Sequence, residues 1–301
     1  MVLAGGTGSA KLLRGLKGEA GEFTVISNVA DNFWHHGLYI APDVDIAVYT
    51  LAGLEDAVRG WGLRGDTFNS LGQLARMGEE TWFNLGDRDL ATHIFRTEQM
   101  GRGKRLGEIT AMMCARLGVR QRVIPCTDDR LETYVTTRTG AMHLQEFWVK
   151  NRGEPEVEGV EYRGEEGAKP ERGAIEALDA AERIVFCPAN PVTSIMPMLA
   201  VGGIRESIVR SRARKVAVSP MVGGAPVTGP AGKLMRAIGL EPSSLAVSKL
   251  YRGLIDCMMV DPADAHYAEA MRAEGARAVV GSILMRTPAD EVQLAREVLS
   301  A

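Results

Sequence analysis

A glycine-rich turn close to the amino terminus is the first stretch whose residue types indicate chemistry. A short apolar run ends at Ala4, and leucines at helical spacing begin at Leu12. Between them stand Gly5, Gly6, Thr7 and Gly8. A strand, a glycine turn and a helix together suit phosphate, because glycine lets the backbone approach the anion and the helix N-terminus offers unpaired N–H groups. We expect these four residues, with Lys11 in the first helical turn, to bind a nucleotide phosphate.

This turn differs from two widespread phosphate motifs. Lys11 stands where a Rossmann dinucleotide motif has its third glycine, and Asn28 ends the next expected strand, where an acid would hold a ribose. A P-loop needs Gly-Lys followed by Ser or Thr, whereas Lys11 lies between Ala10 and Leu12. The pattern therefore favours a nucleotide site that is neither a standard NAD site nor an ATPase site.

Asp43 and Asp45 are the candidate metal ligands. They are separated by one residue, Val44, and stand just before an expected helix over residues 46–54. One or two carboxylates together with substrate phosphates suit Mg²⁺. Asp45 could instead only cap the helix while Asp43 is solvated, but the phosphate turn one strand away makes us favour the metal.

A zinc hydrolase site is a weaker alternative. His35, His36 and His93 could join the two aspartates, but no HExxH or CxxC spacing supports zinc. We therefore rank this alternative below magnesium.

Two further motifs could be either structural or functional. Arg88 lies between two aspartates before an expected helix, where it could pair with them or face a substrate phosphate. Asn190, Thr193 and Ser194 follow an expected strand at the start of a helix, where Asn190 could cap the helix or contact a ligand. The glycine- and proline-rich residues 219–234 read as a binding loop.

Short apolar strands alternate with helices along the chain. This pattern predicts an α/β fold with a doubly wound, mostly parallel, Rossmann-like sheet and helices on both faces. We expect one domain over residues 1–301, with a helical insertion at about 55–118 and a hairpin with a charged lid at about 129–172. Within these we expect a hairpin of strands 133–137 and 141–149, an exposed arm or lid element at 151–172 and a possible strand at 245–248. Ligands of such folds bind at the carboxyl ends of the strands, where the motifs above gather.

Composition and charge narrow the class of protein. The chain has 301 residues with a net charge of −3, which gives no support for a nucleic-acid partner. No apolar run approaches the roughly 20 residues of a membrane span, and the expected first strand begins at the amino terminus, so we expect no membrane association and no signal peptide. Four widely spaced cysteines suggest buried free thiols in a reducing cytoplasm.

Five stretches, in this order, resemble the 2-phospho-L-lactate transferases of coenzyme F420 biosynthesis: GGTGSAKLLRGL, NVADNFWHHGLYIAPDVDIAVYTLAG, NLGDRDLATHIFRT, CPANPVTSI and VSPMVGGAPVTGPAGKLM. The resemblance implies a guanosine diphosphate donor joined to lactate or a related three-carbon acid such as enolpyruvate. It implies the deazaflavin Fo as acceptor, whose ribityl hydroxyl attacks the phosphorus, with GMP as leaving group and Mg²⁺ as cofactor. The sequence does not name the three-carbon acid.

The resemblance also implies roles for the candidate residues. The glycine turn and Lys11 would hold donor phosphates, while Asn190, Thr193 and Ser194 would hold the guanosine or its phosphate. Asp43 and Asp45 would hold Mg²⁺, with Asp45 also near the attacking hydroxyl. Arg88 would stabilise charge or contact Fo, and Trp34, His35 and His36 would border the deazaflavin ring.

The chain departs from the family pattern at two positions, and a rival function also stays open. Members often have Pro where this chain has Ala10, and a second acid where it has Asn32 after Asp31, which puts the role of Asp31 in doubt. The alternative is a nucleotide-sugar-binding regulatory protein that shares the glycine-rich opening and has no transferase activity. We expect a homodimer; the apolar residues 195–201 could form its interface or belong to the core.

Overall fold

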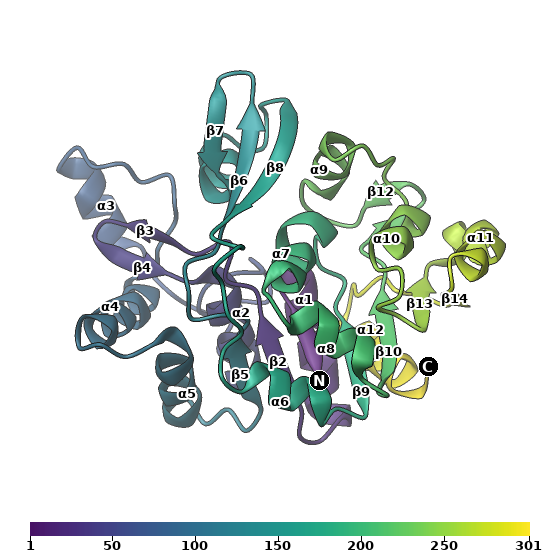
Figure 1. Ribbon diagram of the computed structural model, residues 1–301. Helices are drawn as coiled ribbons and strands as arrows, with labels where there is room; N and C mark the ends of the chain where they lie inside the picture. Colours follow the sequence, from purple (N-terminus) through teal and green to yellow (C-terminus); the bar gives the residue numbers. More distant parts are fainter.

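Seven parallel strands form the central sheet of the computed structural model, which describes residues 1–301 (Figure 1). Their order across the sheet is β14-β13-β10-β9-β1-β2-β5, and every neighbouring pair is parallel. The strands are β1 (Val2–Ala4), β2 (Thr24–Ser27), β5 (Arg122–Pro125), β9 (Arg183–Phe186), β10 (Arg214–Val218), β13 (Cys257–Val260) and β14 (Arg277–Val280). The order reverses between β1 and β9, so the carboxyl ends of these two strands mark the crevice where such sheets bind ligands.

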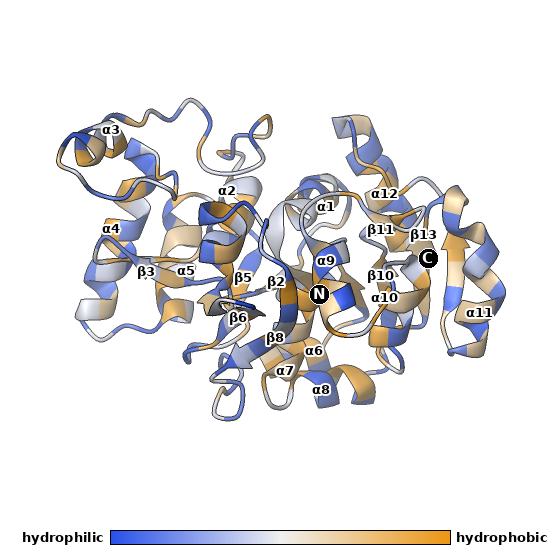
Figure 2. Cartoon of the chain, turned by 90° about the horizontal axis from the view of Figure 1, so that it is seen from above, coloured by the Kyte–Doolittle hydropathy of each residue, from blue (hydrophilic) through white to orange (hydrophobic).

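Helices cover both faces of the sheet, which confirms the doubly wound α/β fold. Strand residues alternate between two cores: Leu3 belongs to one, and its neighbours Val2 and Ala4 belong to the other. Viewed from above, the strands are mostly apolar, and the surrounding helices carry hydrophilic residues on their outer sides (Figure 2). The helices are α1 (Gly6–Glu19), α2 (Pro42–Ala52), α3 (Asn69–Arg76), α4 (Asp87–Gly101), α5 (Leu106–Arg116), α6 (Ala174–Asp179), α7 (Met196–Ala200), α8 (Ile204–Arg210), α9 (Ala231–Ala237), α10 (Ser244–Leu250), α11 (Ala268–Ala273) and α12 (Pro288–Ser300).

Small antiparallel pieces are added at the carboxyl edge of the sheet. A three-stranded sheet in the order β7-β6-β8, here called the lid sheet, projects at the top of Figure 1. It consists of β6 (Glu132–Thr137), β7 (Gly140–His143) and β8 (Val157–Arg163), with the helical turn η1 (Glu146–Lys150) between the last two. Two hairpins, β3 (Phe33–His35) with β4 (Leu38–Ile40) and β11 (Met221–Val222) with β12 (Ala225–Pro226), and the turns η2 (Pro191–Ile195) and η3 (Pro262–Tyr267) complete the elements.

Two expectations about local structure are wrong, and a third holds in one of its two forms. Residues 245–248 belong to helix α10, which begins where the Ser243 hydroxyl accepts a hydrogen bond from the Ala246 N–H; a short apolar run does not distinguish a strand from a buried helix. The second hairpin strand ends at His143, and residues 146–150 form η1 instead. The arm at 151–172 contains β8, which pairs with β6 and is therefore part of the lid sheet.

The structure also bears on what was expected of the cysteines, of residues 195–201 and of membrane-spanning helices. All four cysteines are buried and free, as expected. Ile195, Met198 and Val201 are fully buried in the core of this single chain, so residues 195–201 do not form an exposed dimer face. No single helix is long and apolar enough to cross a membrane, although the bent pair Pro191–Ala200 and Ile204–Arg210 meets the criteria of length and composition.

Candidate active site

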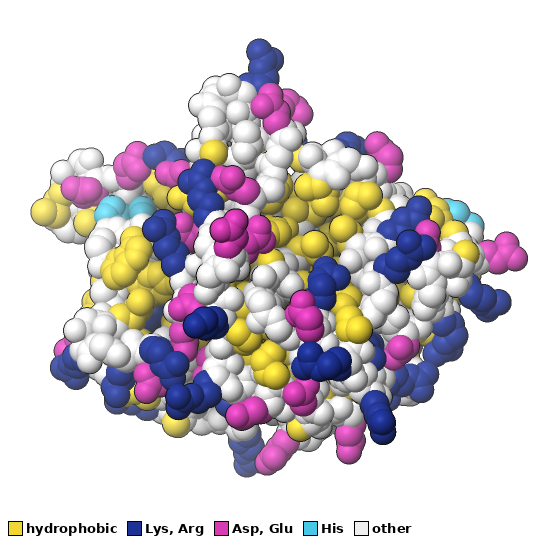
Figure 3. Space-filling view, in the orientation of Figure 1, with side chains coloured by type: hydrophobic (Ala, Val, Ile, Leu, Met, Phe, Trp, Pro, Cys, Tyr) yellow, Lys and Arg dark blue, Asp and Glu magenta, His cyan; other side chains and the backbone are white.

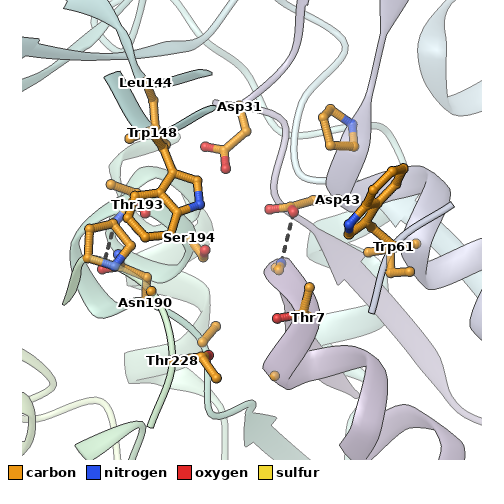
Figure 4. Close-up of a pocket in the computed structure, with 18 of the residues that line it drawn as sticks. Thr7, Asp31, Asp43, Trp61, Leu144, Trp148, Asn190, Thr193, Ser194 and Thr228 are labelled. Atoms are coloured by element: carbon orange, nitrogen blue, oxygen red, sulfur yellow. Dashed lines mark hydrogen bonds between the residues drawn. The ribbon is translucent and has the colours of Figure 1, made fainter. Parts of the chain in front are cut away.

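A cavity of about 460 Å³ opens at the carboxyl ends of β1 and β9, where the strand order reverses. It is bordered by the turn after β1, the first turn of α2, the segment after β9, the loop after β10 and η1 below the lid sheet (Figure 4). Ten of the residues predicted for the site line it: Gly5, Gly6, Thr7, Gly8, Lys11, Asp43, Asp45, Asn190, Thr193 and Ser194. The topology therefore brings together residues that lie almost 200 positions apart.

The glycines of the first turn are required by close packing. A Cβ atom on Gly8 would lie 2.2 Å from the Pro188 carbonyl oxygen, and one on Gly5 would lie 2.7 Å from Ser194 Cβ. Gly6 has a φ of +69°, a backbone conformation that favours glycine. The turn thus packs directly against the segment that leaves β9, and only glycine fits at these positions.

Asp43 joins this turn to the end of β2. Its Oδ1 accepts a hydrogen bond from the Gly6 N–H at 2.8 Å, and its Oδ2 accepts one from Asn28 Nδ2 at 2.9 Å. Asn28 also donates to the Thr193 carbonyl at 3.2 Å, so this residue, placed where a ribose-binding acid would stand, connects three walls of the cavity. The Gly6 N–H is therefore engaged by a carboxylate of the protein.

Asp31 and Asp43 form the carboxylate pair that faces the cavity (Figure 4). Burial, and then the negative charge of Asp43, raise the pKa of Asp31 well above its usual range. Burial also raises the pKa of Asp43, although the hydrogen bonds from Asn28 and Gly6 oppose the shift. Asp31 Oδ1 is buried without a hydrogen-bond partner. Two close acids with an unpartnered oxygen form a site that a cation would stabilise.

The position of Asp45 differs from the expected helix cap. Helix α2 begins at Pro42, a residue suited to the first helical position, so both aspartates lie within its first turn. Residues two apart point to different sides of a helix. Asp45 forms an ion pair with the fully buried Arg96, and its Oδ2 lies 3.7 Å from His93 Nδ1. Burial raises the pKa of Asp45, and the positive charge of Arg96 opposes this shift.

The donor set fits a Mg²⁺ site with few protein ligands. No group of three or more His, Cys, Asp or Glu residues could hold a metal ion. Mg²⁺, however, is usually held by one or two carboxylates together with waters and substrate phosphates. Asp43 with Asp31 provides such a pair more directly than Asp43 with Asp45, because Arg96 already neutralises Asp45.

The segment after β9 combines a cap with free hydroxyl groups. Asn190 Oδ1 accepts hydrogen bonds from the backbone N–H groups of Val192 at 3.0 Å and Thr193 at 3.4 Å, so Asn190 does cap η2. The side chains of Thr193 and Ser194 border the cavity (Figure 4). On the facing side, Lys11 lines the cavity and donates to the Met285 carbonyl at 2.9 Å.

Arg88, Trp34 and His36 do not line the cavity. Arg88 is exposed and donates to the Arg64 carbonyl at 3.1 Å. Trp34 is 58% exposed on the β3–β4 hairpin, and His36 Nε2 lies 2.9 Å from the Glu80 carbonyl oxygen. Two expectations stay predictions: that Trp34 and His36 border a bound ring, and that Arg88 stabilises charge or contacts Fo. Both would require movement of the hairpin or of α4.

Other residues supply the aromatic and polar walls. Trp61 and Trp148 border the cavity from opposite sides (Figure 4), and neither stands in a motif singled out from the sequence. Tyr49 donates to Asp89 Oδ1 at 2.7 Å, and Asp89 lies 3.5 Å from His93 Nε2. Asp89, His93 and Arg96 are spaced four and three residues apart, so one face of α4 points at Asp45. That spacing was the available signal for Arg96.

Comparison of the sequence with known proteins assigns the chain to a family. Residues 1–295 match the family model described as 2-phospho-L-lactate transferase CofD. A phosphoenolpyruvate transferase of Streptomyces griseus is 43% identical over 99% of this chain and 96% of its own length. A 2-phospho-L-lactate transferase of Methanosarcina mazei is 38% identical over 100% of this chain and 99% of its own length.

The fold has a solved counterpart at lower sequence similarity. A crystal structure of a UPF0052 family member from Bacillus halodurans superposes with a TM-score of 0.65 at 20% identity, covering 99% of this chain and 97% of the other. That likeness supports the fold alone. The family model and the two transferases cover nearly the whole chain, and the chain therefore belongs to the 2-phospho-L-lactate transferase CofD family.

Proposed function

We propose that this protein transfers a phospho-three-carbon-acid group, 2-phospho-L-lactate or phosphoenolpyruvate, from a guanosine diphosphate donor to the ribityl hydroxyl of Fo in coenzyme F420 biosynthesis. The observation that carries the proposal is the cavity at the reversal of strand order. It combines a glycine turn at a helix N-terminus, two facing carboxylates and two tryptophans. The relatives named phosphoenolpyruvate transferase and 2-phospho-L-lactate transferase support this chemistry.

The donor would lie across the turn after β1. Lys11 and the N-terminus of α1 supply positive charge for its diphosphate, and the hydroxyl groups of Thr193 and Ser194 border the same space. Phosphoryl transfer depends mainly on positioning and on neutralising charge. These residues would therefore hold the phosphorus in place while GMP leaves.

The acceptor hydroxyl would lie near Asp45. The hydroxyl oxygen forms a new bond to the phosphorus that carries the three-carbon acid, and the bond from this phosphorus to the GMP oxygen breaks. Asp45 Oδ2 is buried without a hydrogen-bond partner, so it could accept the hydroxyl proton. Arg96 keeps the Asp45 carboxylate in one orientation.

Mg²⁺ is part of the proposal. Asp43 and Asp31 would hold the ion, with Asp45 as the further ligand that the sequence suggests. The ion would neutralise charge on the diphosphate oxygens. The protein itself fixes Asp43 through Gly6 and Asn28 before any ligand binds.

The direct test is product formation from defined donors. Purified protein is incubated with Fo, MgCl₂ and guanosine diphosphate linked either to lactate or to enolpyruvate, and mass spectrometry detects GMP and the Fo adduct. We expect product from at least one donor, and the same rate from Asp179→Asn, which alters an exposed acid on α6. A protein that binds a nucleotide sugar but never alters Fo would overturn the proposal and favour the regulatory alternative.

A further inference from the structure

Trp148 is a large aromatic side chain left partly uncovered at the mouth of the cavity. It lies on η1, below the lid sheet, and 42% of its surface is exposed. Its ring extends into the cavity above Thr193 and Ser194 (Figure 4). Over the face of the molecule in Figure 3, Lys, Arg, Asp and Glu are interspersed with apolar side chains, so charge alone marks no second site there.

Gly153 packs directly against the indole ring. A Cβ atom on Gly153 would lie 2.8 Å from Trp148 Cε3 and 2.8 Å from Cζ3. The φ of Gly153 is +64°, which a side chain would also strain. The backbone of this glycine is therefore in direct contact with the ring, and a side chain at this position would displace the ring.

Lys233, on helix α9, fixes the position of Gly153. Its ammonium group donates to the carbonyl oxygens of Gly153 at 2.8 Å, Glu154 at 3.0 Å and Pro155 at 3.2 Å. The three N–H groups of the ammonium are therefore all engaged by three consecutive carbonyl groups of the segment after η1. Helix α9, which carries Lys233, directly follows the loop whose residues Val227 to Pro230 line the cavity.

We propose that Trp148 is a stacking platform for the planar heteroaromatic ring of a substrate, and that Lys233 is a positioning residue that holds this platform through Gly153. The purine of the nucleotide and the tricyclic ring of the deazaflavin share this chemistry, since both present a flat π-face. The inference rests on the proposed function for the identity of these rings. To that function it adds a role for Trp148 in selecting flat rings. It also adds a role for the contact between Lys233 and Gly153 in holding Trp148 in place.

Binding measurements without turnover test the platform. We titrate wild type, Trp148→Phe and Trp148→Leu separately with GMP and with Fo and determine each Kd. Trp148→Leu should raise the Kd of one of the two ligands roughly 5- to 100-fold, and Trp148→Phe should have an intermediate effect. The ligand whose Kd rises is the one whose ring stacks on Trp148. Unchanged affinity for both ligands, in a protein that still transfers the group, overturns the platform and leaves the proposed function standing. A wild type that binds neither ligand overturns the proposed function, and the platform with it.

Matched glycine variants test the contact with the ring. Gly153→Ala and Gly103→Ala both place a side chain at positive φ, but a Cβ on Gly103 would meet nothing within 4 Å. Both variants should have a lower free energy of unfolding in urea. Only Gly153→Ala should also raise the Kd of the ligand that stacks on Trp148. Equal affinities in the two variants would contradict the contact.

A double-mutant cycle tests the role of Lys233. Lys233→Gln should raise KM for the ligand that stacks on Trp148 and leave kcat nearly unchanged, because no reacting atom is touched. Lys233→Arg, which keeps the charge, should recover part of the affinity. Adding Lys233→Gln to Trp148→Leu should cause no further loss, since both changes remove one interaction. Additive losses would overturn the positioning role.

Discussion

The guanidinium group of Arg96 is fully buried and forms an ion pair with the Asp45 carboxylate at the wall of the cavity. Arg96 also donates to the Tyr39 carbonyl at 3.2 Å and lies 3.1 Å from His93 Nδ1. Two elements 51 residues apart in the sequence are thus joined by a buried charge pair. Asp45 therefore stabilises the fold in addition to its proposed chemical role.

Asp45→Ala should lower both activity and stability. The change leaves the Arg96 charge buried and unpaired, which typically costs about 3–5 kcal/mol. Urea unfolding measures this loss, and the double variant Asp45→Ala/Arg96→Met should regain much of the lost free energy. If the double variant is stable and still inactive, Asp45 acts in the chemistry. Wild-type turnover by the double variant would remove Asp45 from the reaction.

Stability should fall with rising pH because of Asp31. A carboxyl whose pKa is raised in the folded state binds its proton more tightly there than in the unfolded chain. Its contribution is therefore complete at low pH and is lost as pH rises through the folded-state pKa. Asp31→Asn removes this loss, so without divalent ions the variant should exceed wild type in unfolding free energy at pH 8, and the difference should vanish below about pH 4.

Asp87 provides the control of opposite sign. Hydrogen bonds from Thr67, Ser70 and Asn69 hold the pKa of this exposed carboxyl below its usual range. Its contribution is present at neutral pH and is lost on acidification, so Asp87→Asn should be less stable than wild type at pH 8. A stability profile for Asp31→Asn that parallels wild type at every pH would contradict the assigned shift.

Mg²⁺ should raise the thermal midpoint of wild type by binding to the Asp31 and Asp43 pair, because a ligand that binds only the folded state stabilises it. Asp31→Asn and Asp43→Asn should each lose most of this response in the presence of GDP, while Asp179→Asn should keep it. Differential scanning fluorimetry with and without EDTA measures the effect. The same Mg²⁺ response in all four proteins would place the ion elsewhere.

The sheet was predictable from the sequence because its strands are short, apolar and regularly separated by helices. The glycine turn was equally clear, since glycines at the junction of a strand and a helix have few other uses. Trp148 was not found, because residues 141–149 were expected to form a strand, whereas residues 146–150 form η1. The partner of Asp45 was missed for another reason. The spacing of Asp89, His93 and Arg96 marks one polar face of α4, but only the tertiary fold brings Arg96 on that face to Asp45.

Gly8→Ala should destabilise the turn after β1. Its Cβ would lie 2.2 Å from the Pro188 carbonyl oxygen, and backbone on both sides leaves little room to adjust. We expect a loss of roughly 1–3 kcal/mol or more from such overpacking. Gly18→Ala lies on the same helix and meets nothing within 4 Å, so it should be stabilising by about 0.5–1 kcal/mol. Urea unfolding compares the two, and losses of equal size would mean that the close approach to Pro188 is unimportant.

Lys11→Ala should weaken the binding of GDP because it removes a positive charge from the wall of the cavity that faces the diphosphate. A charge-assisted hydrogen bond contributes about 1.5–3 kcal/mol, which corresponds to at least a tenfold rise in Kd. Lys17→Ala is the matched control, since Lys17 is exposed in the last turn of the same helix. Calorimetric titrations at low and high salt should show a smaller salt dependence for Lys11→Ala than for Lys17→Ala, because one fewer charge then meets the anion. Equal affinities for the two variants would mean that Lys11 serves only to hold the Met285 carbonyl, and that the diphosphate is bound by the helix N-terminus and the metal site alone.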